Sequence, residues 1–121
     1  MAGVESLLQL RELYADHNGL ESMAPLAALT ELHTLELSNN RLQAVACASL
    51  VSLEELWLND NQITDITPLV ENTGISGTIA LKNNPLSNTA LSAHIPALIE
   101  RGITVEYNLP EGVVLFKDSN L

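Results

Sequence analysis

The chain has 121 residues, enough for one small domain, and its 15 acidic and 5 basic residues give a net charge of −10. So few Lys and Arg residues argue against nucleic acid or an anionic membrane as a partner, because both attract clusters of positive charge. The acidity favours a protein or peptide partner of basic character, or it serves only to keep the chain soluble. Apolar residues make up 46% of the chain but aromatic residues only 3%, which favours many small, similar layers over one large core.

Residues 1–9 lack the basic start, the long apolar stretch and the cleavage site of a signal peptide. No apolar run approaches transmembrane length. We therefore expect the chain as given to be cytoplasmic, or secreted if it is a fragment of a longer protein. The single cysteine, Cys47, lies between Ala46 and Ala48, so we expect a small buried side chain there and neither a disulfide nor a nucleophile.

One pattern of alternating apolar residues that ends in asparagine recurs five times along the chain. Its second copy consists of Leu32, Leu35, Leu37, Asn40 and Leu42. The asparagines of the five copies are 22, 21, 23 and 24 residues apart and are Asn18, Asn40, Asn61, Asn84 and Asn108. Three copies match nearly every position of L-x-x-L-x-L-x-x-N-x-L, so the chain resembles leucine-rich-repeat proteins.

This periodicity predicts an α/β leucine-rich-repeat solenoid, a curved right-handed superhelix with a parallel sheet on its concave side and short 3₁₀ or irregular turns on its convex side. The strand leucines should point inward and the residues between them outward. The five asparagines should form a structural ladder, because each side-chain amide can bond backbone groups of its own turn and the next. The predicted single domain, 1–121, comprises a half repeat at 1–9, repeats at 10–31, 32–52, 53–75 and 76–99, a capping helix at 87–101, and a terminal strand and tail at 100–121.

The fourth repeat carries the signals of that C-terminal capping helix. Ser87 is a suitable N-cap for a helix that begins near Asn88, and Gly102 suits the position just after its end. Pro96 should kink the helix or restart it. The apolar run Val113–Phe116 is expected to add an edge strand or to cover the final layer.

Two segments resemble a particular branch of these repeat proteins. The segment Ile63–Leu69 is similar to the repeats of internalins and of related bacterial proteins with 22-residue repeats, and Asn84–Val105 is similar to the closing unit of many bacterial repeat proteins. The resemblance covers roughly residues 4–108. It implies a protein-binding scaffold, but it does not identify the target because partners within the family differ widely.

The outward strand positions form rows across the concave sheet, and aromatic and acidic residues gather there. One row is predicted to run Tyr14, Glu36, Trp57, Ala80 and Thr104, and another His17, Asn39, Asp60, Asn83 and Tyr107. Exposed rings beside carboxylates make good anchors for a partner, although the same rings can simply pack across the sheet. The candidate partner-binding residues are Glu12, Tyr14, Asp16, Glu36, Glu55, Trp57, Asn59, Asp60 and Lys82.

The N-terminal end shows no dedicated cap. Val4, Leu7 and Leu10 match the apolar positions of the second half of a repeat, so an apolar layer should be open there. This end is expected to continue into a longer protein or to meet another surface, as in a homodimer. The alternative function is therefore a structural repeat fragment that oligomerises through its uncapped end.

No motif for catalysis, for a cofactor or for a metal appears, so neither an enzyme nor a bound cofactor is expected. His17, His33 and His94 should not converge on one point of the solenoid. Asp60 and Asp65 lie in a stretch that lacks the glycine and the alternating ligands of a calcium loop.

Overall fold

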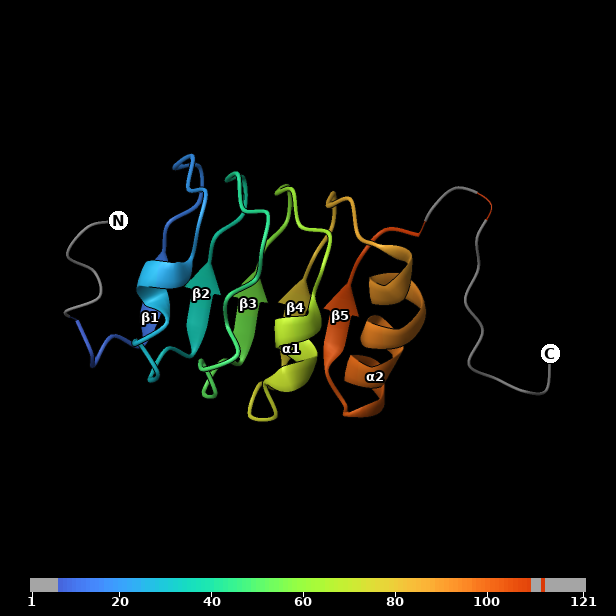
Figure 1. Cartoon of the computed structure of the whole chain (residues 1–121). Helices are drawn as coiled ribbons and strands as arrows, with labels where there is room; N and C mark the ends of the chain where they lie inside the picture. The colour runs from blue at the N-terminus through green and yellow to red at the C-terminus, as the bar shows by residue number, and fades with distance from the viewer. Residues whose placement is uncertain (1–6, 110–111, 113–121) are drawn as a thin grey trace.

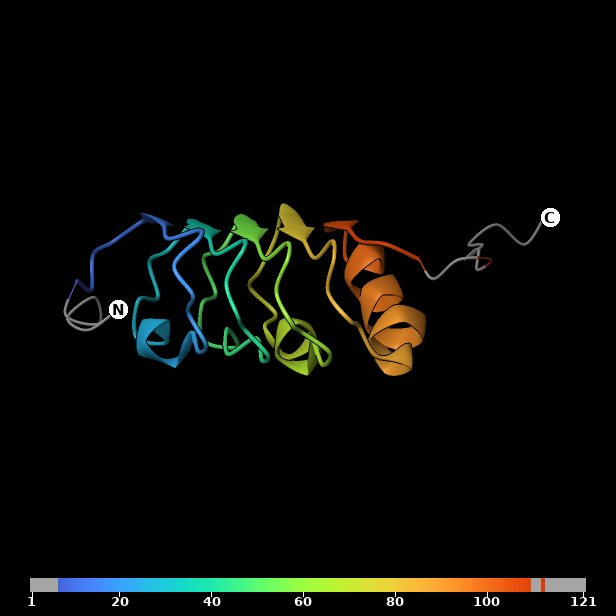
Figure 2. The same ribbon diagram turned by 90° about the horizontal axis from the view of Figure 1, so that it is seen from above.

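The computed structural model describes residues 7–109 and residue 112 of the chain. Within this part of the chain the strands form one parallel sheet in chain order: β1 (Glu12–Tyr14), β2 (Thr34–Glu36), β3 (Glu55–Trp57), β4 (Thr78–Ala80) and β5 (Thr104–Glu106). The sheet covers one side of the molecule, and the segments that return the chain to the next strand cover the other (Figures 1 and 2). The predicted solenoid with a parallel sheet is confirmed.

Alternation along each strand separates the core from the sheet surface. The central residues Leu35, Leu56 and Ile79 are fully buried and pair with one another across β2, β3 and β4. The next inward positions, Leu37 and Leu58, are also fully buried. Because side chains alternate along a strand, the two inward leucines of each repeat lie next to the corresponding leucines of the neighbouring repeat. The residue between the two leucines faces outward.

The register of the last strand differs from the sequence-based prediction by two residues. Ala80 pairs with Glu106 rather than with Thr104, and Thr104 pairs with Thr78. The reason is the return segment of the fourth repeat, which contains a helix and therefore uses more residues than the shorter turns before it. Aligning the repeats by their asparagines does not reveal this extra length.

The earlier return segments are short. The first contains a 3₁₀ turn, Ala24–Leu26, with Pro25 in its first turn, as the spacing of apolar residues by three predicted. The third contains α1 (Thr67–Glu71), a single α-helical turn in place of the predicted 3₁₀ or irregular turn. Asp65 Oδ1 accepts hydrogen bonds from the N–H and the hydroxyl of Thr67 at 2.9 and 2.6 Å, which ties down the chain where α1 begins.

The fourth return segment is a π-helical stretch, Ala90–His94, that continues into α2 (Ile95–Glu100). Ser87 Oγ accepts a hydrogen bond from the Ala90 N–H at 3.1 Å, so the predicted N-cap is confirmed. Pro96 has no N–H to bond within the helix, and the Ile95 N–H instead reaches the Ala90 carbonyl, five residues back. The predicted disturbance at Pro96 thus takes the form of a π-helical stretch just before it, and the capping role of the helix stays a prediction.

The core is a column of leucine and isoleucine side chains between the sheet and the return segments. Cys47 is fully buried within it, as predicted, and this burial raises the pKa of its thiol to about 12. Val4, which was expected to belong to the open apolar layer at the N-terminal end, lies outside the described residues. So does the run Val113–Phe116, which was expected to add an edge strand or to cover the final layer. None of the described helices is long and apolar enough to cross a membrane.

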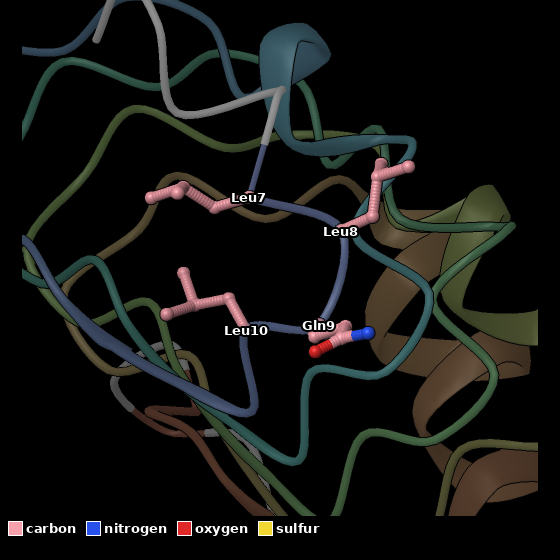
Figure 3. A pocket seen from close by; sticks show the side chains of 4 residues that line it. All are labelled: Leu7, Leu8, Gln9 and Leu10. Carbon is pink, nitrogen blue, oxygen red and sulfur yellow. The ribbon is translucent and has the colours of Figure 1, made fainter.

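Apolar side chains are exposed at the N-terminal end of the solenoid. Leu7 and Leu8 are 52% and 56% exposed, whereas Leu29, which occupies the same repeat position as Leu7, is fully buried. A hollow of about 500 Å³ lies beside them and is lined by Leu7, Leu8, Gln9 and Leu10 (Figure 3). The described residues at this end therefore present an apolar surface of the kind that successive repeats bury against each other.

Candidate functional site

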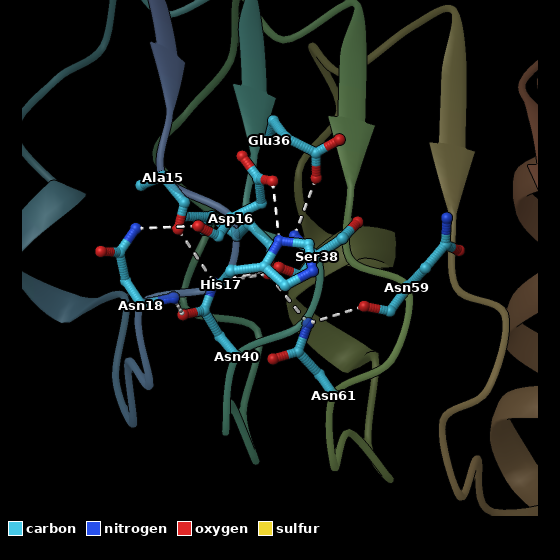
Figure 4. Close-up of polar contacts among 10 residues, drawn as sticks. Ala15, Asp16, His17, Asn18, Glu36, Ser38, Asn40, Asn59 and Asn61 are labelled. Carbon is cyan, nitrogen blue, oxygen red and sulfur yellow. Dashed lines mark hydrogen bonds and ion pairs between the residues drawn. The ribbon is translucent and has the colours of Figure 1, made fainter.

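The asparagines at the ends of the strands hold neighbouring repeats together. Asn40 Oδ1 accepts hydrogen bonds from the N–H groups of Asn18 and Leu20, both at 2.9 Å. Its Nδ2 donates to the carbonyls of Ala15 and Leu37 at 3.1 and 2.9 Å (Figure 4). One buried side chain thus satisfies backbone groups of two successive turns, which fixes where each strand of the sheet ends.

The same bonds recur in the next repeats but not in the last. Asn61 Oδ1 accepts from the Leu42 N–H at 3.0 Å, and Asn84 Oδ1 accepts from the Ile63 N–H at 3.1 Å. Asn108 was predicted as the next member of this ladder, but the register of β5 places it beside Lys82, two residues too early. Its Oδ1 instead accepts from the Asn83 N–H at 2.7 Å. Asn108 therefore links the last two repeats by a different bond.

A second repeated position turns the chain away from each strand. His17, Asn39, Asp60 and Asn83 have φ between 58° and 61°, the left-handed region that Asn, Asp and His tolerate better than most residues. Tyr107 was predicted for the same row, yet the register pairs it with Leu81, which is an inward position. Tyr107 accordingly packs against the hydrophobic core. It is no part of an exposed aromatic row.

The outward residues of β1, β2 and β3 form an acidic and aromatic surface. Tyr14, Glu36 and Trp57 pair directly across the three strands, in the predicted order. Glu12, Thr34 and Glu55 form the parallel row two residues earlier. Tyr14 is 64% exposed, and Trp57 is half-buried. We call the five residues Glu12, Tyr14, Glu36, Glu55 and Trp57 the acidic-aromatic patch.

Hydrogen bonds hold one oxygen of each carboxylate in this patch. The Tyr14 hydroxyl donates to Glu12 Oε1 at 2.9 Å. The Thr34 hydroxyl donates to Glu55 Oε2 at 3.3 Å, and the Ser38 N–H donates to Glu36 Oε1 at 2.8 Å. The second oxygen of each carboxylate forms no hydrogen bond within the described part of the chain, so it is available to a donor from outside.

The negative field of the patch acts on Tyr14. Its hydrogen bond to Glu12 raises the pKa of the Tyr14 phenol, and loss of hydration and the charges of Glu12, Glu55 and Glu36 raise it further. All three carboxylates of the patch thus oppose a new negative charge at the ring. They favour a positive one for the same reason.

The other candidate residues lie where the strands end. Asp16 Oδ2 is 2.9 Å from His17 Nδ1, and this hydrogen bond lowers the pKa of the Asp16 carboxyl. Asn59 Oδ1 accepts from the Lys82 N–H at 2.8 Å, and Asp60 Oδ1 accepts from Asn83 Nδ2 at 3.0 Å. Asn59 and Asp60 therefore help to join neighbouring repeats.

Comparison with known proteins agrees with this geometry. A family model described as "Leucine Rich repeats (2 copies)" matches residues 30–71. The crystal structure of internalin C2 from Listeria monocytogenes is similar, with 30% sequence identity over 87% of this chain and a TM-score of 0.72. The internalin inlF of the same organism has 25% identity over 88% of this chain and a TM-score of 0.74. No curated protein sequence matches the chain.

The chain is a leucine-rich-repeat solenoid, and it is similar to internalins. It spans 45% of the length of the internalin C2 chain and 32% of that of the internalin inlF chain. Leucine-rich-repeat domains generally mediate protein–protein interactions, and the repeat stack provides the extended surface on which they do so.

One buried residue of this leucine-rich-repeat protein was missed by sequence reasoning. Asn72 is fully buried on the convex side, where its Nδ2 donates to the carbonyls of Cys47 and Leu50 at 2.9 and 3.0 Å. Its Oδ1 accepts from the N–H groups of Gly74 and Ile75 at 3.0 and 3.1 Å. Asn72 is not part of the repeat pattern and has no counterpart in the other repeats, so periodicity alone could not reveal its structural role.

The titratable groups of the leucine-rich-repeat protein are spread along the stack. His33 Nε2 lies 3.7 Å from Glu54 Oε2 and 3.4 Å from an Arg11 guanidinium nitrogen, at the start of the strands. His17 lies at the strand ends and His94 in the π-helical stretch. Among residues 7–109 and 112, no group of three or more His, Cys, Asp or Glu side chains is arranged to hold a metal ion.

Proposed function

We propose that the concave sheet face binds a protein or peptide of basic character. The acidic-aromatic patch supplies the central contacts, and the rim consists of Asp16, Asn59, Asp60 and Lys82. The observation that carries the proposal is the row Tyr14, Glu36 and Trp57 on adjacent strands. Trp and Tyr dominate the energetics of protein interfaces, and the carboxylates between and beside them would steer a positively charged partner onto the sheet.

The proposed activity is binding without chemistry. The carboxylates of the patch lie on an open sheet surface and keep their ordinary role as charged acceptors. Parallel strands about 4.8 Å apart give a regular surface on which an extended segment can contact several strands. The proposed partner is therefore a protein or peptide and neither a nucleic acid nor an anionic membrane, because the net charge of −10 repels both.

Selection from a random peptide display library tests this proposal. Wild-type protein should enrich sequences with net positive charge, and the double variant Tyr14→Ala/Trp57→Ala should lose that enrichment while keeping its circular dichroism spectrum. Val51→Ala is a matched control, because Val51 is an exposed apolar side chain outside the outward strand positions. Enrichment of the same peptides on the double variant would contradict the proposal.

A second candidate function is self-association through the N-terminal end, which the exposed Leu7 and Leu8 favour. Apolar surface of this kind would be covered in a dimer. Light scattering over a range of concentrations should then show a dimer that Leu7→Gln/Leu8→Gln dissociates. A mass that stays monomeric at every concentration would exclude this function. A dimer with unchanged Trp57 emission would leave the concave face free for a partner.

A further inference from the structure

We infer that Trp57, Glu36 and Glu55 form a seat for one arginine side chain of the partner. This inference rests on the proposed function and specifies it further. A general acidic surface would attract any cation, whereas the seat has a shape that distinguishes guanidinium from ammonium.

Trp57 has a carboxylate on two sides. Glu36 is its direct partner on the adjacent strand, so the two backbones are about 4.8 Å apart. Glu55 lies two residues earlier on the same strand and faces the same side, roughly 6.6 Å along the chain. Because Trp57 is half-buried, part of the ring rests against the protein and the rest is open to the concave side.

The two carboxylates are held in place but not neutralised. Each uses one oxygen internally, Glu36 with the Ser38 N–H and Glu55 with the Thr34 hydroxyl. The ion pairs found within the described part of the chain involve His17 with Asp16 and His33 with Glu54, and neither includes these two glutamates. Two negative charges beside an aromatic ring therefore have no cationic partner among residues 7–109.

A buried hydroxyl beside the seat is also unpaired. Ser38 is 7% exposed and lies two residues after Glu36, on the same side of the sheet (Figure 4). Its Oγ is buried and has no hydrogen-bond partner among the described residues. Buried hydroxyl groups normally have a partner, and the N–H of the same residue already donates to Glu36 Oε1, so an unsatisfied polar group lies directly beside one carboxylate of the seat.

Arginine fits these groups better than lysine does. A planar guanidinium can stack on the face of the Trp57 ring while its N–H groups, which point outward in the guanidinium's own plane, donate to the carboxylates at the sides. An ammonium group is a compact point charge that cannot stack and donate sideways in the same position. The seat ends at β4, where Ala80 pairs with Trp57 and Lys82 lies just beyond. A second cation is therefore not accommodated on that side.

Trp57 is the only tryptophan of the chain, so its fluorescence reports directly on the seat. The probes are three blocked peptides, acetyl-Gly-Ala-X-Ala-Gly-amide, in which X is arginine, lysine or the uncharged citrulline. The arginine peptide should change the Trp57 emission with a Kd about tenfold lower than that of either other peptide. Equal Kd values for the arginine and lysine peptides would overturn the inference, because simple charge attraction predicts that result.

Variants separate the seat from the charge of the whole protein. Glu36→Gln keeps the oxygen that accepts from the Ser38 N–H but removes the charge, and should raise the Kd of the arginine peptide to that of the citrulline peptide. Glu31→Gln removes the same charge from an exposed residue outside the patch and should leave the Kd within twofold. An unchanged Kd in Glu36→Gln would refute the seat.

The two proposals can fail separately. Display peptides that need Tyr14 and Trp57 but tolerate lysine in place of every arginine would leave the proposed function standing and overturn the arginine seat. Peptides that bind the double variant as well as wild type would overturn both.

Discussion

The asparagine ladder leads to a quantitative prediction for Asn40→Ala. The substitution leaves the N–H groups of Asn18 and Leu20 without the acceptor that each now has at 2.9 Å. Removing a partner from a buried polar group costs about 1–3 kcal/mol for each group left unsatisfied. Because water reaches part of this region once the side chain is gone, we expect a total loss of about 3 kcal/mol in the free energy of unfolding.

Asn18→Ala is the matched control at the same repeat position. Asn18 is exposed, and its side chain forms one hydrogen bond within the described residues, to the Asp16 carbonyl at 3.0 Å. Its loss should cost only about 0.5–1 kcal/mol. Asn40→Asp should be as damaging as Asn40→Ala, because a carboxylate cannot donate to the Ala15 and Leu37 carbonyls and places a negative charge beside them.

Urea unfolding followed by far-ultraviolet circular dichroism measures these free energies, with the slope m expected to remain constant across the variants. A loss at Asn40→Ala no larger than that at Asn18→Ala would refute the reasoning. A stable Asn40→Asp variant would refute the assignment of Nδ2 as the donor to the two carbonyls.

Three further predictions concern the core and a turn. Burial raises the pKa of the Cys47 thiol to about 12, so Cys47 should react with a thiol reagent at pH 8 only after unfolding. The contribution of this thiol to the free energy of unfolding should be complete below pH 9 and lost as the pH rises towards 12. Rapid labelling of the folded protein would contradict the burial of Cys47. Leu56→Ala should lower the free energy of unfolding by about 3 kcal/mol, measured by urea unfolding, because Leu56 is fully buried at the centre of the sheet; a loss below about 1 kcal/mol would contradict that packing. Gly77→Ala should lower the free energy of unfolding by at least about 2 kcal/mol more than Gly19→Ala in the same assay. Both glycines have positive φ, but a Cβ at Gly77 would collide with the Glu54 backbone, whereas a Cβ at Gly19 meets open space. Equal losses in the two variants would contradict this reasoning.

The repeat pattern predicted most of the fold because each position of a repeat has one physical role. The strands β1, β2 and β3 and the pairing of Tyr14 with Glu36 and Trp57 follow directly from the spacing of the leucines. The prediction was wrong by two residues at β5, where Tyr107 became an inward residue. A helix with a proline in its first turn lengthens the preceding segment, and the periodicity contains no information about that length.

The chemistry of the patch was only partly accessible from the sequence. Residue types and period-two alternation predicted that the carboxylates of β1, β2 and β3 share a face with the Tyr14 and Trp57 rings. The sequence could not show which carboxylate oxygens are already bonded, or that Ser38 Oγ is buried without a partner, because both depend on side-chain torsions. Asn72 was missed for a related reason, since its four bonds connect segments that share no repeat position.

The central claim is that partners bind on the concave face across β1, β2 and β3. Nuclear magnetic resonance tests it most directly, by titrating isotope-labelled protein with a peptide enriched by display. We predict that the largest shift changes fall on the backbone amides of Tyr14, Glu36 and Trp57 and on the Trp57 indole N–H. Changes confined to the convex residues, such as Ala27 and Ser49, or to Leu7 and Leu8 at the N-terminal end, would contradict the account.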